Sequence, residues 1–158
     1  MRIGIITSGG DAPGMNAAIR AITRCALDKG VEVVGIHEGW QGVVDGGEQF
    51  EPFNWRSVGG ILQLGGTILG TARSEIFRTV AGRRQAVRNL ILNGLDGLVV
   101  IGGDGSFHGA RALSALGMPC IGIPGTIDND LEFSETSLGF DTAVNVCVDA
   151  VRAIRATS

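Results

Sequence analysis

The stretch LDGLVVIGGDGSFHGARALSAL, residues 95–116, contains a continuous apolar run, a glycine-rich turn and a helical pattern, in that order. The apolar run, residues 95–101, predicts a strand that is buried on both faces, because a strand with one solvated face alternates apolar and polar residues. Residues 105–116 predict the helix that follows. A buried strand, a short turn and a helix form the repeating unit of a parallel sheet with helices on its faces.

The same order of strand and helix continues on both sides of this stretch. Residues 37–72 are broken by pairs of glycines, and we expect only small helices and loops there. The sequence therefore predicts an α/β fold, a three-layer sandwich with a mainly parallel sheet. The other predicted strands are 2–7, 31–36 and 119–123, and the other predicted helices are 14–29, 82–93 and a last one that begins near Thr136 and runs toward Ser158.

Composition excludes several classes of protein. Of the 158 residues, 44% are hydrophobic and 18% are charged, which is too apolar for a disordered chain. The 26 glycines follow no collagen period, and no apolar run is long enough to suggest a membrane span. A net charge of −3 gives no electrostatic reason to expect a nucleic acid or an anionic membrane as partner.

Three cysteines, Cys25, Cys120 and Cys147, are widely spaced and form no metal-binding pattern. Each falls in a predicted helix or strand, so we expect three small buried side chains. An odd number of free thiols indicates a reducing compartment, and we therefore expect a cytoplasmic protein.

Three loops rich in glycine and aspartate follow predicted strands: SGGDAPG at 8–14, GGDGS at 102–106 and PGTIDND at 124–130. In an open parallel sheet the ligand binds beyond the carboxyl ends of the strands. Because all three loops belong to that edge, the sequence predicts a functional site there.

The GGDGS loop suits a phosphate chain. Its glycines allow the backbone to approach a ligand, and the next helix N-terminus offers unpaired N–H groups with partial positive charge. Asp104 is a candidate for holding Mg²⁺ against such a phosphate. The alternative is that Asp104 caps the helix and the glycines only form the turn. This loop alone leaves both interpretations open.

The PGTIDND loop carries Asp128 and Asp130. A carboxylate beside a transferring phosphoryl group can accept the proton of the attacking hydroxyl. The alternative is that Asp-Asn-Asp is ordinary turn chemistry, and the loop alone favours that alternative.

Arginine and the backbone must supply any phosphate contact in this chain. Of its 13 cationic residues, 12 are arginine, and the exception, Lys29, closes a predicted helix. A phosphate loop with its lysine is therefore absent. Arg73 and Arg78, within GTARSEIFR, are candidates because a guanidinium binds phosphate at two points. The alternative is two solvated arginines on a short helix.

The histidines and tryptophans carry less information. His37 and His108 have no telling spacing, and we interpret both as structural or exposed. Trp40 and Trp55 are interpreted as packing residues.

Several long stretches together resemble one family. The chain is similar to the N-terminal part of the ATP-dependent 6-phosphofructokinases of bacterial type, and the resemblance extends along its whole length. The GGDG turn also occurs in NAD kinases and lipid kinases, so the first and fourth stretches decide between the families. The shared stretches are TSGGDAPGMNAAIR at 7–20, GGTILGTAR at 65–73, VVIGGDGS at 99–106, IPGTIDND at 123–130 and GFDTA at 139–143.

The resemblance implies an enzyme that transfers a phosphoryl group from Mg-ATP to the 1-hydroxyl of fructose 6-phosphate, as in glycolysis. Asp128 is implied to be the general base and Thr126 its catalytic neighbour, and Asp104 is implied to bind Mg²⁺. Substrate binding is implied for Thr126, Ile127 and Asp128. Implied ATP-binding residues are Gly10, Arg73, Ser74, Arg78, Gly103, Asp104, Gly105, Ser106 and Gly109.

Two glycines indicate which phosphoryl donor the resemblance implies. Relatives that use pyrophosphate typically carry Asp where this chain has Gly105 and Lys where it has Gly125. An Asp at position 105 would repel the α-phosphate of a nucleotide, so Gly105 and Gly125 favour ATP. The alternatives are a pyrophosphate-dependent phosphofructokinase and a nucleotide-binding module without turnover.

An effector site is implied less completely. Arg20, Arg24 and Arg155 match effector-site arginines of the family. Trp55 stands where the family can carry another arginine, and Gly60 replaces an acidic residue. Effector binding is therefore expected to be weak or lost.

Members of the family continue well beyond the length of this chain. We therefore expect residues 1–138 to form an incomplete nucleotide-binding domain and residues 139–158 to begin a sugar-phosphate-binding domain. By the same resemblance we expect a truncated chain without measurable kinase activity of its own, from a family of homotetramers.

Overall fold

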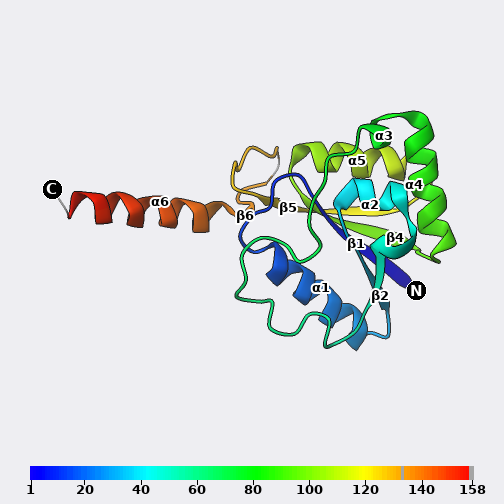
Figure 1. The fold of residues 1–158 in the computed structure, drawn as a ribbon, viewed down its shortest axis with the longest axis horizontal. Helices are drawn as coiled ribbons and strands as arrows, with labels where there is room; N and C mark the ends of the chain where they lie inside the picture. The colour runs from blue at the N-terminus through cyan, green and yellow to red at the C-terminus, as the bar shows by residue number, and fades with distance from the viewer. Residues whose placement is uncertain (133, 157–158) are drawn as a thin grey trace.

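A computed structural model describes residues 1–132 and 134–156. The chain folds around one sheet, with helices on both faces and one helix that extends away from the body (Figure 1). In chain order the elements are β1 (Arg2–Ser8), α1 (Met15–Asp28), β2 (Glu32–Ile36), α2 (Gly39–Asp45), η1 (Gly47–Gln49), β3 (Phe50–Phe53), α3 (Glu75–Arg78), α4 (Val80–Leu92), β4 (Gly97–Gly102), α5 (Asp104–Ser114), β5 (Cys120–Thr126), β6 (Leu138–Gly139) and α6 (Phe140–Arg155).

The sheet has six strands in the order β3-β2-β1-β4-β5-β6. Every neighbouring pair is parallel except β2 and β3, which are antiparallel. The strand order reverses at β1, between β2 and β4, which is where a doubly wound sheet opens a crevice for a ligand. The prediction of an α/β fold with a mainly parallel sheet is confirmed.

Successive residues of the central strands enter two different cores, because side chains alternate across a strand. One core includes α2, α4 and α5, and the other includes α1 and residues 58–69. The strands therefore need apolar residues at every position, which explains their unbroken runs in the sequence. Pairs that divide in this way are Ile5 and Ile6 in β1, Val33 and Val34 in β2, and Val99 and Val100 in β4.

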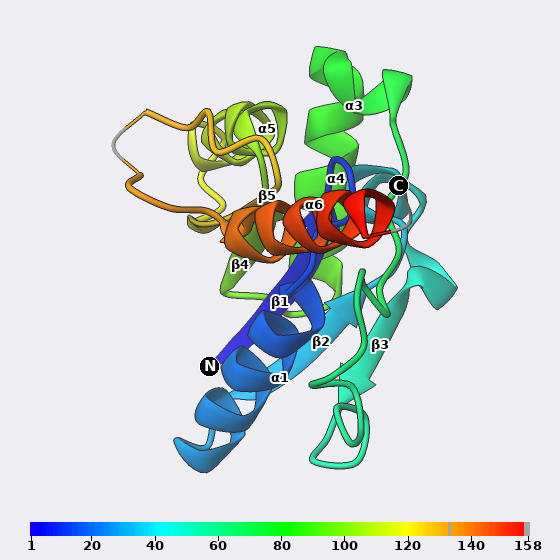
Figure 2. The same ribbon diagram turned by 90° about the vertical axis from the view of Figure 1, so that its left-hand side faces the viewer.

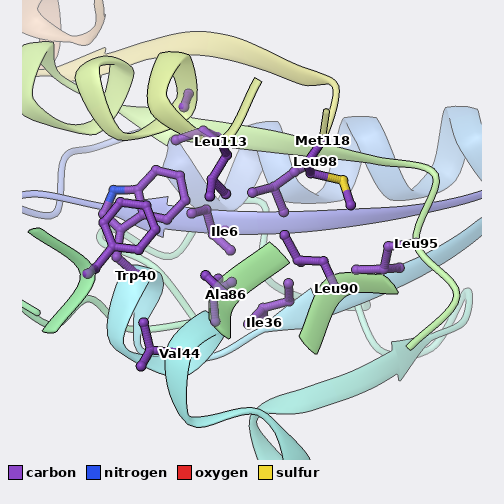
Figure 3. Packing of buried hydrophobic residues seen from close by; sticks show 14 of the residues in the cluster. Ile6, Ile36, Trp40, Val44, Ala86, Leu90, Leu95, Leu98, Leu113 and Met118 are labelled. Carbon is purple, nitrogen blue, oxygen red and sulfur yellow. The ribbon is translucent and has the colours of Figure 1, made fainter. Parts of the chain in front are cut away.

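Helices cover the two faces unequally. Helix α1 lies on one face and α2, α4 and α5 on the other (Figures 1 and 2). Figure 3 shows Ile6 of β1 facing Leu90 of α4 and Leu113 of α5 within the larger core. On the α1 face, Ile121 of β5 stays 67% exposed. The expected burial of both faces is therefore wrong at β5.

Helix α6 projects from the sheet, and none of its described residues is buried. The boundary predicted at 138/139 falls within the two residues of β6. Whether α6 begins a second domain remains a prediction. Among the described residues, no helix combines the length and the apolar character that a membrane crossing requires.

The sequence missed the short strands β3 and β6 and the end of β5. Residues 50–53 form the antiparallel strand β3, inside residues 37–72, where only small helices and loops were expected. In addition, β5 continues through Pro124, Gly125 and Thr126, so the PGTIDND segment is a loop only after its first three residues. Proline is tolerated at that place because β5 lies near the sheet edge, where few ladder bonds are lost.

The prediction of three buried thiols is wrong for two of them. Cys25 and Cys147 are exposed, since Cys25 lies outside the buried face of α1 and no described residue of α6 is buried. Cys120 is partly buried, and burial raises the pKa of its thiol. Cys120 is therefore less able than an exposed cysteine to form a thiolate at neutral pH.

Two leucines of α4 test the larger core. Leu90 is fully buried and Leu92 is 71% exposed. We expect Leu90→Ala to lower the free energy of unfolding by roughly 2–5 kcal/mol, because it removes buried methyl groups and leaves a cavity. Leu92→Ala should change it by no more than about 0.5 kcal/mol, as at other surface positions. Denaturant unfolding of both variants is the measurement, and equal losses would contradict this core.

Candidate functional site

Three strand ends of the sheet lie side by side. Ser8 of β1 is paired with Gly102 of β4, and Gly102 is paired with Pro124 of β5. Strands β1 and β4 therefore end at one level, and β5 continues for two more residues, to Thr126. Gly102 has to be a glycine, because a Cβ there would lie 2.6 Å from Ser106 Oγ and would also meet the carbonyl oxygen of Ser8.

A cleft of about 1130 Å³ lies at this edge. Its lining combines loop residues from all three strand ends with residues 71–78, so the predicted site is brought together in one place. All residues predicted to bind ATP or substrate line it: Gly10, Arg73, Ser74, Arg78, Gly103, Asp104, Gly105, Ser106, Gly109, Thr126, Ile127 and Asp128.

Helix α5 begins at the floor of the cleft without a side-chain cap. Gly103 is the N-cap residue, and Asp104 is the first residue of the helix. The alternative in which Asp104 caps the helix is therefore wrong. The Asp104 carboxylate lies 3.4 Å from His108 Nδ1 and is about two thirds exposed. A Cβ added at Gly105 would meet no atom within 4 Å, so the protein leaves this space open beside the helix N-terminus.

The loop after β5 holds its turn with Asn129, not with its aspartates. Asn129 has a left-handed backbone (φ 50°), and its Oδ1 accepts a 2.9 Å hydrogen bond from the Ser137 N–H. The Ser137 hydroxyl in turn donates to the Thr126 carbonyl at 2.7 Å. Within the described residues, the carboxylates of Asp128 and Asp130 have no hydrogen-bond or ion-pair partner. Ordinary turn chemistry thus accounts for Asn129 and leaves both carboxylates free at the cleft.

Three arginines face the cleft from the segment before and within α4. Arg73 and Arg78 were predicted, and Arg83 was not. Arg78 forms an exposed ion pair of 3.5 Å with Glu75, whereas Arg73 and Arg83 have no carboxylate partner among residues 1–132 and 134–156. Ser74 has a structural task as well, because its Oγ accepts the Phe77 N–H and caps α3.

An aromatic pair forms the inner wall. Trp40 and Phe77 stack with ring centroids 4.4 Å apart, and both line the cleft. Gly109 gives Trp40 its space, since a Cβ at Gly109 would lie 2.7 Å from the indole. Trp40 is therefore a packing residue, as predicted, and also a wall of the site.

Sequence reasoning missed Arg83, Trp40 and His108 as residues of the cleft. Residues 83–88 contain three arginines. Only its position near the start of α4 distinguishes Arg83 from the other two. His108 carried a usable signal, because it lies one helical turn after Asp104 and shares its face.

The three predicted effector arginines do not come together. Arg20 donates a 2.6 Å hydrogen bond to the Val58 carbonyl, and the guanidinium of Arg24 lies 5.6 Å from the centre of the Trp55 ring. Arg155 lies at the end of α6, which points away from the body (Figure 1). The effector role of these residues remains a prediction.

The fold and the cleft define a doubly wound α/β protein whose ligand site is built from strand-end loops. The phosphofructokinase family model matches residues 2–158, and the chain belongs to that family.

Its relatives include two curated proteins named ATP-dependent 6-phosphofructokinase. The protein of Clostridium tetani is 58% identical over 99% of this chain, and that of Clostridium botulinum strain Hall is 56% identical over the same share. The chain spans about half the length of these relatives, 49% and 48%. A solved phosphofructokinase structure from Saccharomyces cerevisiae covers 99% of this chain at a TM-score of 0.92 and 38% identity, and the chain covers 24% of that protein.

Two glycines of α5 are expected to respond differently to alanine. Gly105→Ala adds a methyl group in open space, and Gly109→Ala forces one against Trp40. Helix propensity favours alanine at both positions, by at most about 1 kcal/mol, but only Gly109→Ala overpacks the core. Gly109→Ala should therefore be less stable than Gly105→Ala by roughly 1–3 kcal/mol, the usual cost of overpacking. Denaturant unfolding measures the difference, and equal stabilities would contradict the described position of Trp40.

Proposed function

We propose that this chain contributes the nucleotide-binding and proton-accepting side of an ATP-dependent 6-phosphofructokinase. The reaction is phosphoryl transfer from Mg-ATP to the 1-hydroxyl of fructose 6-phosphate. The observation that carries the proposal is the shared cleft, in which Asp104, Asp128 and Arg73 come from three separate segments. Curated relatives with that activity, at 56–58% identity, support the same conclusion.

The triphosphate would lie over the N-terminus of α5. The uncapped N–H groups of this helix and the guanidiniums of Arg73 and Arg78 supply positive charge where phosphate oxygens accumulate negative charge. Ser106, which is buried, fixes the first turn of the helix through its backbone bond to the Gly103 carbonyl. These groups position and stabilise the donor without covalent chemistry, as phosphoryl transfer requires.

Asp128 would accept the proton of the attacking hydroxyl. Its carboxylate is exposed to the cleft and has no competing cation within the described residues. The Asp128 N–H donates to Thr126 Oγ1 at 3.2 Å, which fixes the start of the loop that carries the carboxylate. Thr126, the last residue of β5, and Ile127, which follows it, would contact the sugar phosphate.

The donor set fits magnesium bound together with a nucleotide. Within the described residues, no group of three or more metal-binding side chains occurs, so the protein offers no complete cage. Magnesium commonly takes one or two protein carboxylates and completes its shell with phosphate oxygens and water. Asp104 would hold it, and bound magnesium would neutralise charge on the phosphates.

Gly105 supports ATP as the donor more strongly than Gly125 does. The space beside Gly105 is empty. A Cβ at Gly125 would instead lie 3.0 Å from the Ile101 side chain, so packing explains that glycine without a ligand. The donor assignment therefore depends on Gly105. Assembly as a homotetramer and a cytoplasmic location belong to the proposal through the family alone.

Asp128→Asn tests the base. Turnover should fall by roughly 10²–10⁴-fold, the usual contribution of a general base, with little change in Mg-ATP affinity. The assay follows ADP release on addition of fructose 6-phosphate, with the chain extended at its C-terminus by the second half of the Clostridium tetani relative. Asp45→Asn, an exposed carboxylate on α2 outside the cleft, is the control. Near-normal turnover of Asp128→Asn would remove it from the base role.

Gly105→Asp tests the donor. A carboxylate in the open space beside α5 should weaken the use of ATP more than the use of pyrophosphate, because only the nucleotide carries an α-phosphate there. The ratio of the two turnover rates in the same extended chain is the measurement. An unchanged ratio would show that the donor does not pass Gly105.

A further inference from the structure

Residues 64–70 lie shortly before Arg73 in the chain and contain no helix or strand. Leu69 within them is completely buried, and residues 71–73 continue directly into the cleft. A segment without regular structure needs other partners for its backbone groups. Two buried polar side chains from outside the segment, Thr7 and Asn16, supply them.

Asn16 binds the first part of the segment at three backbone groups. Its Nδ2 donates to the carbonyls of Leu64 at 3.1 Å and Gly65 at 3.2 Å, and its Oδ1 accepts the Ile68 N–H at 2.7 Å. The residue is 1% exposed, so these hydrogen bonds have little competition from water. Asn16 thus closes residues 64–68 around one side chain.

Thr7 binds the other part of the segment through a directed chain of hydrogen bonds. The Thr7 hydroxyl lies 2.8 Å from the Gly70 carbonyl, which can only accept, so Thr7 donates there. The 2.8 Å contact between the two hydroxyls must then be donated by Thr67. Thr67 Oγ1 in turn accepts the Leu69 N–H at 3.1 Å. The single proton of each hydroxyl is therefore used.

The same two residues flank the loop of residues 8–14. Thr7 precedes it in β1, and Asn16 follows it in the first turn of α1. Two segments that line the cleft, one carrying Gly10 and the other Arg73, are therefore fixed to common anchors.

We propose that Asn16 is a positioning residue that acts through Arg73. By fixing residues 64–68, it holds the backbone from which the guanidinium reaches a bound triphosphate, and Thr7 assists it at Gly70. The inference rests on the proposed nucleotide site. It adds to that site a residue that does not contact the ligand.

A double-mutant cycle in the 158-residue chain tests the inference, with calorimetry of Mg-ATP binding as the readout. Asn16→Asp keeps the size and the acceptor for Ile68 but cannot donate to Leu64 and Gly65. Arg73→Met removes the guanidinium and keeps the length. Each single variant should weaken binding roughly tenfold, equivalent to about 1.4 kcal/mol. The double variant should lose no more than Arg73→Met alone, because residues that act through one another are not additive.

Asn89→Asp is the matched control. Asn89 also donates its Nδ2 to two carbonyls, of Val43 and Val44, but lies outside the cleft. Its variant should lose stability and keep its affinity for Mg-ATP. Thr7→Val, which fits a strand, repeats the cycle with a second anchor in case Asn16→Asp folds poorly.

The possible results distinguish a failure of the positioning role from a failure of the proposed nucleotide site. Non-additive losses for Asn16 or Thr7 with Arg73, and none for Asn89, support the positioning role. Losses that multiply would overturn it and leave the nucleotide site intact. A parent chain that binds no Mg-ATP would overturn the proposed nucleotide site, and the inference with it.

Discussion

The structure depends on the alignment of three strands at Ser8, Gly102 and Pro124, which form one row across β1, β4 and β5. Parallel pairing fixes that row, because β1 and β4 are buried on both faces and a shift by one residue would exchange the two cores. Everything that reaches the cleft from the sheet leaves from this row. The site is therefore a consequence of the hydrophobic pattern in the strands, although most of the residues that line the cleft lie outside the strands.

The strands, most helices and the cleft residues could be predicted from the sequence because each has a local signal. Continuous apolar runs marked β1, β2 and β4, and their following glycines marked the loops. Three features had no such signal. Strand β3 has only four residues and is defined by its pairing with β2. The exposure of Cys25 and Ile121 depends on which elements cover them, and the place of Arg83 in the cleft depends on how α4 is oriented. These features depend on tertiary packing, which the local propensity of a segment does not determine.

Charge in the cleft is separated rather than cancelled. Arg73, Arg78 and Arg83 come from residues 73–83, whereas Asp104 and Asp128 come from the strand-end loops. Within the described residues the two sets form no ion pair with each other. A direct pair would occupy the groups that a ligand needs, and it would gain little at the exposed edge of the cleft. Separated charges fit a ligand that carries anionic phosphates on one side and a metal ion on the other.

The backbone that leads to Arg73 is also arranged by groups from separate elements. A helix at residues 64–70 would pair part of its backbone within itself, and that pairing would not fix Arg73 to another element. Side-chain anchors place it relative to β1 and α1, the two elements that flank residues 8–14. The segment that carries Arg73 and the loop that carries Gly10 are thus fixed to the same two elements. A buried threonine or asparagine side chain without a hydrogen-bond partner costs free energy. A segment fixed by such side chains therefore keeps its position only when all of their hydrogen-bond partners are present.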